Sequence, residues 1–407
     1  MKNISKKTKY LISGIMVLVL AFSICGCEKS GESLLSTGSN DESDGNVLND
    51  EVIDKTNDIQ DIIDENFYFE EDVDNVEENV YKGMMEGLDD PYSVYYTPEE
   101  YTELMEDTSG EYVGIGVQVN QDPETMLITV TKVFKDGPAS KVGIKKGDII
   151  TAVDDWELAG EEVEQVVKKI KGKEGSMVKI TVYREGEHDY LEFDTARQMV
   201  ENPTVEYRML ADDIGYISVA SFYDVTADQY KAAVEDLKSQ GMKGLIVDLR
   251  DNPGGLLTTV VDMLDYMLPE GKLVYTEDKD GNILEEFDST DEEQFTLPLV
   301  VMINENSASA SEIYAGAIKD YGAGKLVGIQ TFGKGIVQRI FDLGDGSALK
   351  LTIAKYFTPN GNDIHEIGVA PDVEVELSDE AKEATILDET NDNQLQKGIE
   401  VLKEEMK

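Results

Sequence analysis

The chain contains very few of the residues that metal sites and disulfide frameworks require. Its 407 residues include two cysteines, Cys25 and Cys27, and two histidines, His188 and His365. Zinc sites and disulfide networks both need several such side chains, so this composition argues against either. A metal site would have to be built from carboxylates alone, and we expect neither a metal nor another cofactor.

Positive charge is also scarce. Lys and Arg together number 36 against 84 Asp and Glu, which gives a formal net charge of -48. A surface this acidic repels phosphate backbones, so nucleic-acid binding is excluded as a function. The 41% hydrophobic and 29% charged residues are an ordinary globular balance. At about 150 residues per domain, the length predicts two or three folded domains.

The N-terminus has the layout of a secretory signal. Lysines among the first nine residues precede an apolar run over residues 11–24, which is short for a membrane-spanning helix. The run ends in Ile24-Cys25-Gly26-Cys27, which resembles a bacterial lipoprotein signal and implies lipidation at Cys27. Residues 1–27 are therefore predicted to be the signal, and an uncleaved anchor helix is the alternative. Either places the rest of the protein on the extracytoplasmic face of the bacterial cell membrane, beyond a flexible acidic linker over residues 28–49.

Residues 50–109 are predicted to form an N-terminal helical region. Apolar residues recur at helical spacing from residue 50 to 88, which indicates two amphipathic helices, and Thr97-Pro98 is typical of the start of another. The apolar stripes need a partner. That partner is either the body of the same chain or a second copy, which makes a homodimer one expectation.

The next segment, residues 110–197, changes to strand-like alternation rich in glycine. Val113-Gly114-Ile115-Gly116 is followed by Gly137-Pro138-Ala139 and the stretch up to Asp148, and this order resembles a bacterial PDZ domain. The resemblance implies that Val113, Gly114, Ile115 and Gly116 form the loop that binds a peptide carboxylate. Glycines allow consecutive backbone N–H groups to converge on such a group, while the peptide adds as a strand.

From residue 198 to 375 strands alternate with helices, which predicts an α/β domain with a buried sheet. The acidic insertion over residues 277–293 is expected at its surface. Residues 376–407 form an acidic C-terminal segment with a helical pattern near its end.

One loop in the α/β region contains a candidate nucleophile. Asn304 to Ile313 follows a buried strand and enters a helix through small residues, including Ser307, Ser309 and Ser311. A hydroxyl at such a junction lies near free N–H groups that favour an oxyanion. A serine-rich helix cap is the simpler interpretation of this segment taken alone. Histidine is the first candidate base, but neither His188 nor His365 belongs to a recognisable triad motif.

Lysine is the other candidate base. Lys334 lies between Gly333 and Gly335, and residues 328–334 match the start of a phosphate loop. However, Gly335 replaces its Ser or Thr and a strand follows instead of a helix, so nucleotide binding is rejected. A lysine acts as a base only when burial lowers its pKa, and flanking glycines permit close packing around it. Gln338 can orient Lys334 without adding negative charge.

Together these motifs resemble the C-terminal processing peptidases, also called tail-specific proteases. The similar segments are Asp248 to Gly255, Ser307 to Glu312, Thr331 to Gln338, Thr358 to Gly361 and Gly368 to Asp372. The resemblance implies a crotonase-like α/β protease core with an inserted PDZ domain and N-terminal helices.

It also implies a role for each matching residue. Ser309 would be the nucleophile, Lys334 the base and Gln338 its support. The N–H groups of Gly255 and Ala310 would form the oxyanion hole, with Gly254 as the substitute for Gly255. Lys171 stands where relatives often carry arginine, which would weaken a bidentate contact from the PDZ domain.

The sequence therefore predicts a serine endopeptidase that recognises protein C-termini through its PDZ domain and cleaves extracytoplasmic proteins. The alternative is a non-catalytic PDZ scaffold that binds peptides at the membrane surface. A histidine-based hydrolase using His365 is the third hypothesis.

Overall fold

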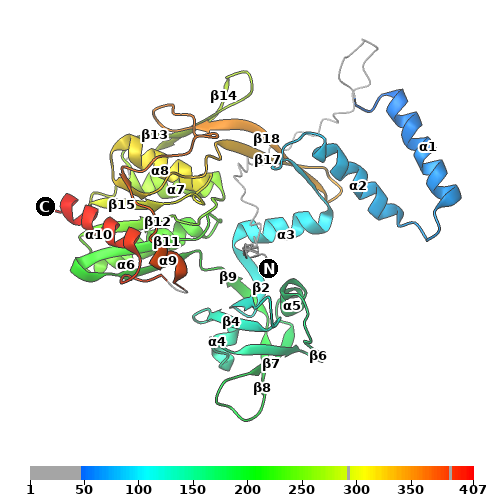
Figure 1. Ribbon diagram of the computed structural model, residues 1–407, viewed down its shortest axis with the longest axis horizontal. Coiled ribbons are helices and arrows are strands. Elements are labelled where there is room, and N and C mark those ends of the chain that lie inside the picture. Colours follow the sequence, from blue (N-terminus) through cyan, green and yellow to red (C-terminus); the bar gives the residue numbers. More distant parts are fainter. Residues whose placement is uncertain (1–46, 291–293, 385–386) are drawn as a thin grey trace, which may run out of the picture.

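The computed structural model describes residues 47–290, 294–384 and 387–407 (Figure 1). The predicted signal, including Cys27, lies outside the described residues. None of the described helices combines the length and apolarity needed to cross a membrane.

The main body is built on a six-stranded sheet whose central strands are parallel. In spatial order its strands are β10 (Val205–Met209), β11 (Ile214–Val219), β12 (Gly244–Asp248), β15 (Leu299–Ile303), β16 (Lys325–Gly328) and β19 (Val373–Glu374). Every residue of β12 and of β15 is buried, as expected for parallel strands covered on both faces. Between β10 and β11 lies a short 3-10 helix, Ala211–Asp213.

Helices cover both faces of this sheet. On one face the core includes residues from α6 (Thr226–Ser239), α7 (Leu257–Met267) and α8 (Ala310–Tyr321). The other face is covered by α10 (Asn393–Glu405), which follows the short α9 (Asp379–Glu383) and buries Leu395 and Leu402 against Ile246 and Val300. The acidic C-terminal segment is thus part of the packed core (Figure 1).

A second sheet contains strands from both the N-terminal region and the main body. Its members are β1 (Val94–Tyr96), β18 (Ala348–Phe357), β13 (Gly271–Glu277) and β14 (Ile283–Ser289), with β17 (Ile336–Asp342) also paired to β18. Val94 pairs with Lys350, so a strand from the N-terminal region completes a sheet of the main body. Part of the expected surface insertion is the hairpin strand β14, which the sequence analysis did not predict.

Between β1 and β10 the chain forms a smaller unit with its own hydrophobic core. Its strands and helices are β3 (Val117–Gln121), β4 (Ile128–Val133), α4 (Pro138–Val142), β5 (Ile149–Val153), β6 (Trp156–Glu157), α5 (Val163–Ile170), β7 (Met177–Tyr183) and β8 (Leu191–Ala196). A ribbon of β2 (Glu111–Gly114) and β9 (Gln198–Glu201) carries the chain into and out of it. The predicted α/β body with an inserted PDZ-like unit and N-terminal helices is confirmed.

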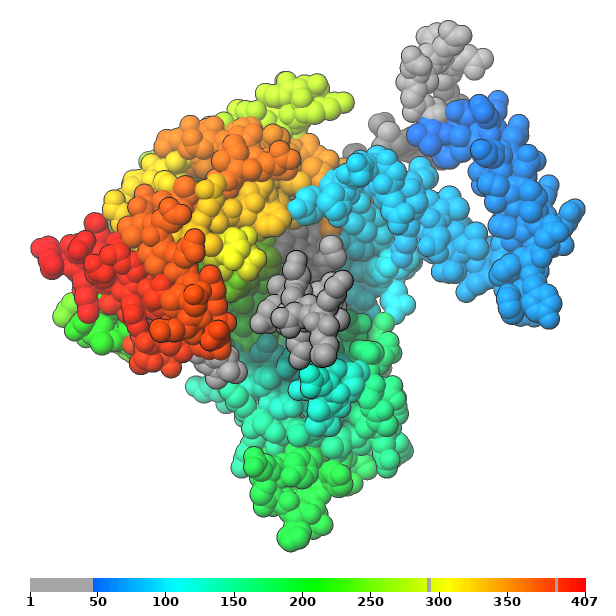
Figure 2. Space-filling view, viewed as in Figure 1, coloured from blue at the N-terminus to red at the C-terminus, as the bar shows by residue number. Residues whose placement is uncertain are grey.

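The N-terminal helices project from the body (Figures 1 and 2). They are α1 (Asp50–Asn66) and α2 (Val73–Glu86), and α3 (Pro98–Ser109) follows β1. Within α1 no residue is buried, and in α2 only Met85 is. The predicted start of α3 has a full capping box, in which Thr97 and Glu100 bond to each other's backbone N–H groups. The apolar stripes of α1 and α2 therefore remain largely uncovered.

Candidate active site

Ser309 lies where β15 leads into α8, at the position that caps the helix. Its φ of 54° and ψ of -115° are a strained combination for a residue with a side chain, and Ser309 is completely buried. Strained backbone of this kind persists only where the surrounding structure enforces it, and it is concentrated at functional sites. The connection between β15 and α8 therefore holds Ser309 in one unusual backbone conformation, at the positive end of the α8 dipole.

The three alternating serines of this loop have different environments. The hydroxyl of Ser307 donates to the Leu249 carbonyl at 2.7 Å, and that of Ser311 donates to the Asn252 carbonyl at 2.8 Å. The Oγ of Ser309 is buried and has no hydrogen-bond partner among the described residues. Since buried hydroxyls are normally paired, the structure distinguishes Ser309 from its two neighbours. Glu312 bonds back to the Ser309 N–H as in a capping box, but the Ser309 hydroxyl makes no hydrogen bond among the described residues, so helix capping alone does not account for this serine.

Lys334 lies in the loop that leads into β17 and is only 4% exposed. Burial lowers the pKa of Lys334 to about 8, and the carboxylates of Asp90 and Glu312 oppose this change. The ring of Tyr92 lies 4.3 Å from the Lys334 Nζ. A lysine in this environment is partly neutral at physiological pH, which is the requirement for a general base.

The glycines beside Lys334 are needed for packing. A Cβ at Gly335 would lie 2.3 Å from the backbone nitrogen of His365, and one at Gly333 would lie 3.1 Å from that of Ile367. Gly333 also has a φ of 91°. The chain segment around His365 can therefore close over the lysine loop only because both positions lack a side chain.

Two buried side chains join the Ser309 segment to the Lys334 segment. One carboxylate oxygen of Glu312 accepts from the backbone N–H groups of both Ser309 and Lys334, each at 2.8 Å. Its other oxygen accepts from Gly333 and from the Thr331 hydroxyl. The hydroxyl of Tyr356 contacts the carbonyl oxygens of Ser309 and Lys334. We call this arrangement, formed by Ser309, Glu312, Lys334 and Tyr356, the catalytic junction.

Neither Glu312 nor Tyr356 was assigned a role from the sequence. Burial raises the pKa of Glu312, while the hydrogen bonds from Thr331, Gly333, Ser309 and Lys334 act in the opposite direction. The only sequence signal was that Glu312 stands three residues after a helix-capping serine, the spacing of a capping box.

Two unpaired N–H groups adjoin the loop that contains Ser309. Those of Gly255 and Ala310, the predicted oxyanion hole, have no hydrogen-bond acceptor in the part of the chain that the structure describes. A Cβ at Gly255 would lie 2.2 Å from the Phe222 carbonyl, so only glycine fits. Asn252 fixes both loops, because its side chain accepts from Gly254 N–H and its carbonyl accepts from Ala308 N–H.

Gln338 lies on β17 and is fully buried. Its Nε2 donates to the Thr352 hydroxyl at 3.3 Å, and its Oε1 has no hydrogen-bond partner among the residues described here. The predicted support of Lys334 by Gln338 therefore stays a prediction.

Neither histidine is seen as a base for Ser309 in the hydrogen bonds of the described residues. His188 is exposed in the turn between β7 and β8. His365 packs its backbone against Gly335, and its Nδ1 is buried without a partner among the described residues. Across the described ranges no group of three or more His, Cys, Asp or Glu side chains could hold a metal ion.

The PDZ-like unit has a cavity of about 310 Å³ beside β3 and α5. Of the predicted carboxylate-binding loop, Ile115 and Gly116 line this cavity, whereas Val113 and Gly114 pair with β9. The ring of Tyr112 also lines it. Burial raises the pKa of Tyr112 to about 12.

Lys171 lines the same cavity. Its Nζ lies 5.2 Å from the ring centroid of Tyr112 and 3.6 Å from a carboxylate oxygen of Glu106 on α3. In this structure Lys171 therefore contacts the helix that leads into the PDZ-like unit.

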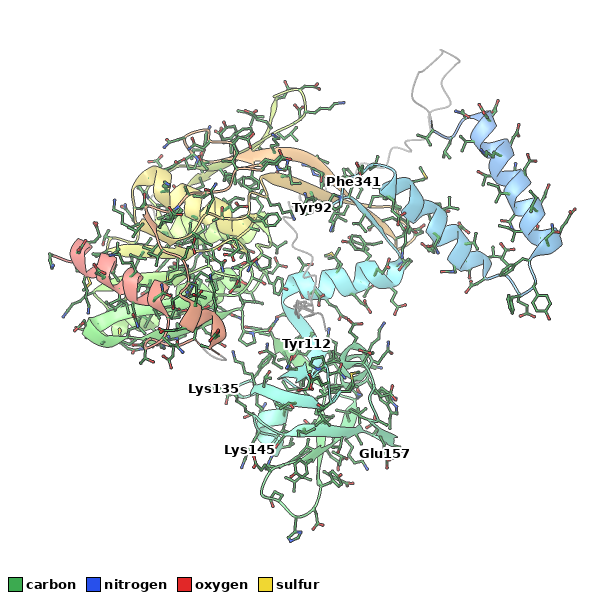
Figure 3. The ribbon with its side chains drawn as sticks, viewed as in Figure 1. Tyr92, Tyr112, Lys135, Lys145, Glu157 and Phe341 are labelled. Atoms are coloured by element: carbon green, nitrogen blue, oxygen red, sulfur yellow. The ribbon has the colours of Figure 1, made fainter. Side chains whose placement is uncertain are left out.

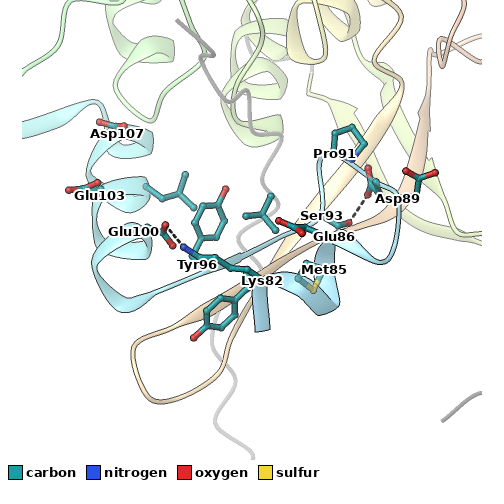
Figure 4. Close-up of a pocket in the computed structure, with 14 residues that line it drawn as sticks. Lys82, Met85, Glu86, Asp89, Pro91, Ser93, Tyr96, Glu100, Glu103 and Asp107 are labelled. Atoms are coloured by element: carbon teal, nitrogen blue, oxygen red, sulfur yellow. Dashed lines mark hydrogen bonds and ion pairs between the residues drawn. The ribbon is translucent and has the colours of Figure 1, made fainter. Parts of the chain in front are cut away.

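A larger groove of about 720 Å³ lies between α2, β1 and α3 (Figure 4). Six of its 14 lining residues are acidic, and Lys82 forms an ion pair with Glu100 at 2.8 Å across it. Asp90 and Ser93 line the groove, so it extends to the turn that carries Tyr92.

Comparison with known proteins is consistent with this organisation. The model of peptidase family S41 matches residues 213–375, a PDZ domain model matches residues 112–195, and the "Activating protease CtpB N-terminal domain" model matches residues 19–100. The carboxy-terminal-processing protease of Bartonella bacilliformis is 37% identical over 308 residues, which cover 74% of this chain and 69% of that protein.

Two further proteins extend the comparison. A probable CtpA-like serine protease of Staphylococcus haemolyticus is 36% identical over 76% of this chain, and the chain spans 62% of that protein's length. The crystal structure of a putative S41 protease from Bacteroides fragilis has a TM-score of 0.52 at 16% identity. The matched region covers 83% of this chain and 92% of the Bacteroides fragilis chain. At this identity the two proteins are similar in fold alone.

Proposed function

This chain belongs to peptidase family S41, with the PDZ-containing carboxy-terminal-processing proteases, and from that premise we propose that it is a serine endopeptidase with a Ser309–Lys334 dyad. The observation that carries the proposal is the catalytic junction. A buried serine with an unpaired hydroxyl and a buried lysine with a lowered pKa are tied together through one oxygen of Glu312.

The chemistry follows from these groups. Neutral Lys334 accepts the Ser309 hydroxyl proton as Oγ attacks the substrate carbonyl, and the N–H groups of Gly255 and Ala310 stabilise the resulting oxyanion. Collapse of this intermediate breaks the peptide C–N bond, and the Lys334 ammonium returns the proton to the leaving amine. Water then hydrolyses the acyl-enzyme, with Lys334 again as base. Gln338 orients the lysine when substrate is bound.

The PDZ cavity selects the substrate in this proposal. A protein's C-terminus adds beside β3, its carboxylate meets the N–H groups near Ile115 and Gly116, and its last side chain enters the apolar cavity. The protein acts on the extracytoplasmic face of the bacterial membrane, held there by lipid on Cys27 or by an uncleaved N-terminal helix. The uncovered stripes of α1 and α2 pair with a second copy.

The test is cleavage of an unfolded protein by the full chain, compared with Ser309→Ala and Lys334→Ala, while the substrate's C-terminal residues are varied. Loss of cleavage by at least about 1,000-fold in both variants, with folding retained, supports the dyad. Wild-type rates in either variant contradict it. Tail binding without cleavage by the wild type would favour the peptide-binding scaffold, and an inactive His365→Ala variant would favour a histidine base.

A further inference from the structure

Hydrogen bonds hold the turn before β1, which contains Asp90, Tyr92 and Ser93, both within itself and to β18. The Asp90 carboxylate accepts from the Tyr92 N–H at 3.0 Å and from the Ser93 hydroxyl at 2.6 Å. The Ser93 hydroxyl in turn accepts from the Thr352 N–H at 3.1 Å, which ties the turn to β18. This geometry fixes where Tyr92 points, although Tyr92 is far from the protease core in sequence.

The Tyr92 ring is directed at the Lys334 Nζ, at 4.3 Å from the ring centroid. Figure 3 shows Tyr92 between the main body and α2, beside the strands of the second sheet. The Asp90 carboxylate belongs to the same turn, and its charge favours the protonated form of Lys334. One short turn thus brings two groups that attract a cation close to the same amine.

Other charged and titratable groups around Lys334 come from the remaining elements. Glu312 on α8 also favours its protonated form. Lys350 on β18 donates to the Tyr96 hydroxyl at 2.8 Å, and burial together with the charge of Lys334 lowers the pKa of Lys350 to about 7. Tyr356 approaches Lys334 at its backbone, where the tyrosine hydroxyl donates to the Lys334 carbonyl oxygen as well as to that of Ser309.

We propose that Tyr92 and Asp90 are positioning residues for the catalytic lysine, holding the Lys334 ammonium over the Tyr92 ring as it takes the Ser309 proton. This inference rests on the proposed role of Lys334 as the base. It assigns a function in the protease chemistry to a turn that lies before the PDZ unit in the sequence.

The physical reason is that the contact with the Tyr92 ring and the charge attraction to Asp90 both strengthen when the lysine becomes charged. A ring face attracts a cation far more than a neutral amine, and so does a carboxylate. Interactions that are stronger in the transition state than in the ground state are the ones that accelerate a reaction. The same contacts also keep the amine in one place inside a site where burial alone would favour its neutral form.

The experiment measures the rate at which a fluorophosphonate phosphonylates Ser309 in the full chain, with loss of fluoride, from about pH 6 to about pH 10. This range brackets the Lys334 pKa of about 8. The variants are Tyr92→Leu, Tyr92→Phe and Asp90→Asn. Tyr92→Phe keeps the ring face, and Asp90→Asn keeps an acceptor for the turn.

In the wild type the rate should rise with pH through a midpoint near pH 8, because only neutral Lys334 accepts the proton. Tyr92→Leu and Asp90→Asn remove groups that favour the ammonium, so the midpoint should move to lower pH by about one unit, with a plateau about tenfold slower. Tyr92→Phe should retain the wild-type midpoint.

A purely structural role predicts something different, namely a uniform loss of rate at every pH with an unchanged midpoint in Tyr92→Leu. That result, or a Tyr92→Phe profile that matches Tyr92→Leu, overturns the inference. Lys334→Ala separates the two proposals. If it reacts like the wild type, the proposed function is wrong, and if it is unreactive while Tyr92→Leu is unshifted, only the positioning role is wrong.

Discussion

The catalytic junction and the PDZ cavity are built in opposite ways. Ser309 and Glu312 are completely buried, and the segments they belong to are joined by hydrogen bonds inside the core. The PDZ-like unit meets α3 through exposed ion pairs, including Lys168 to Glu99 at 2.7 Å and Lys171 to Glu106 at 3.6 Å. Exposed ion pairs contribute little to the free energy of folding, whereas disturbing a buried hydrogen-bond network costs much of that free energy.

This difference in burial suits two different tasks, catalysis in the junction and substrate recognition in the PDZ-like unit. Chemistry requires reacting groups held within a fraction of an ångström, and the buried junction provides that. Recognition of a protein tail tolerates movement, and a unit held by surface ion pairs can shift as it binds. Substitutions in the junction should therefore abolish turnover of every substrate, and substitutions in the PDZ cavity should change only which substrates are used.

Among substitutions outside the Ser309–Lys334 dyad, Glu312→Ala should have the largest effect. It leaves the N–H groups of Ser309, Gly333 and Lys334 without their acceptor, and we expect at least about a 100-fold loss of turnover together with about 2–4 kcal/mol of stability. Protease assays and thermal unfolding measure the two effects. Glu305→Ala, an exposed carboxylate of the same loop, is the control and should be neutral. Equal behaviour of the two variants would show that the junction does not depend on Glu312.

Gly335→Ala tests the packing around the lysine. Its added methyl group would meet the His365 nitrogen at 2.3 Å, so the loop must move. We expect a cost of about 1–3 kcal/mol and a drop in activity of about tenfold. Gly83→Ala is the matched control, because nothing lies within 4 Å of a Cβ at that position on α2. An unchanged Gly335→Ala enzyme would contradict the packing argument.

Val167→Asp should have the smallest effect on the chemistry. Val167 lines the PDZ cavity, and a carboxylate there would repel a peptide's terminal carboxylate. Cleavage of substrates with apolar tails should fall about tenfold, while the preference among tails disappears. A Val167→Ser variant controls for loss of side-chain volume. A retained tail preference in Val167→Asp would mean that selection occurs outside this cavity.

Much of the candidate active site could be proposed from the sequence because its residues lie in short segments that resemble those of the C-terminal processing peptidases. Ser309 stands at the boundary between a buried strand and a helix, and Lys334 stands between two glycines. The buried, close-packed surroundings expected for that lysine are present. A helix and a strand separate the two segments in the chain, and no local pattern shows that Glu312 and Tyr356 join them.

Other features of the fold could not be predicted from the sequence because they also depend on contacts between distant segments. Residues 376–407 have the composition of an exposed acidic tail, yet Asp392 pairs with Arg250 at 2.7 Å and α10 covers one face of the sheet. A buried ion pair between distant segments turns acidic composition into core structure, and composition alone does not reveal it. Likewise, no local pattern indicates that the turn containing Asp90 and Tyr92 reaches Lys334.

The most direct measurement is a peptide map of the full chain after reaction with a fluorophosphonate. We expect a phosphonyl group on Ser309 and none on Ser307 or Ser311, whose hydroxyls are already bonded to carbonyl oxygens. Lys334→Ala should abolish the modification without unfolding the protein. Modification of Ser307 or Ser311 in place of Ser309, or full modification of Ser309 in Lys334→Ala, would contradict the serine–lysine dyad.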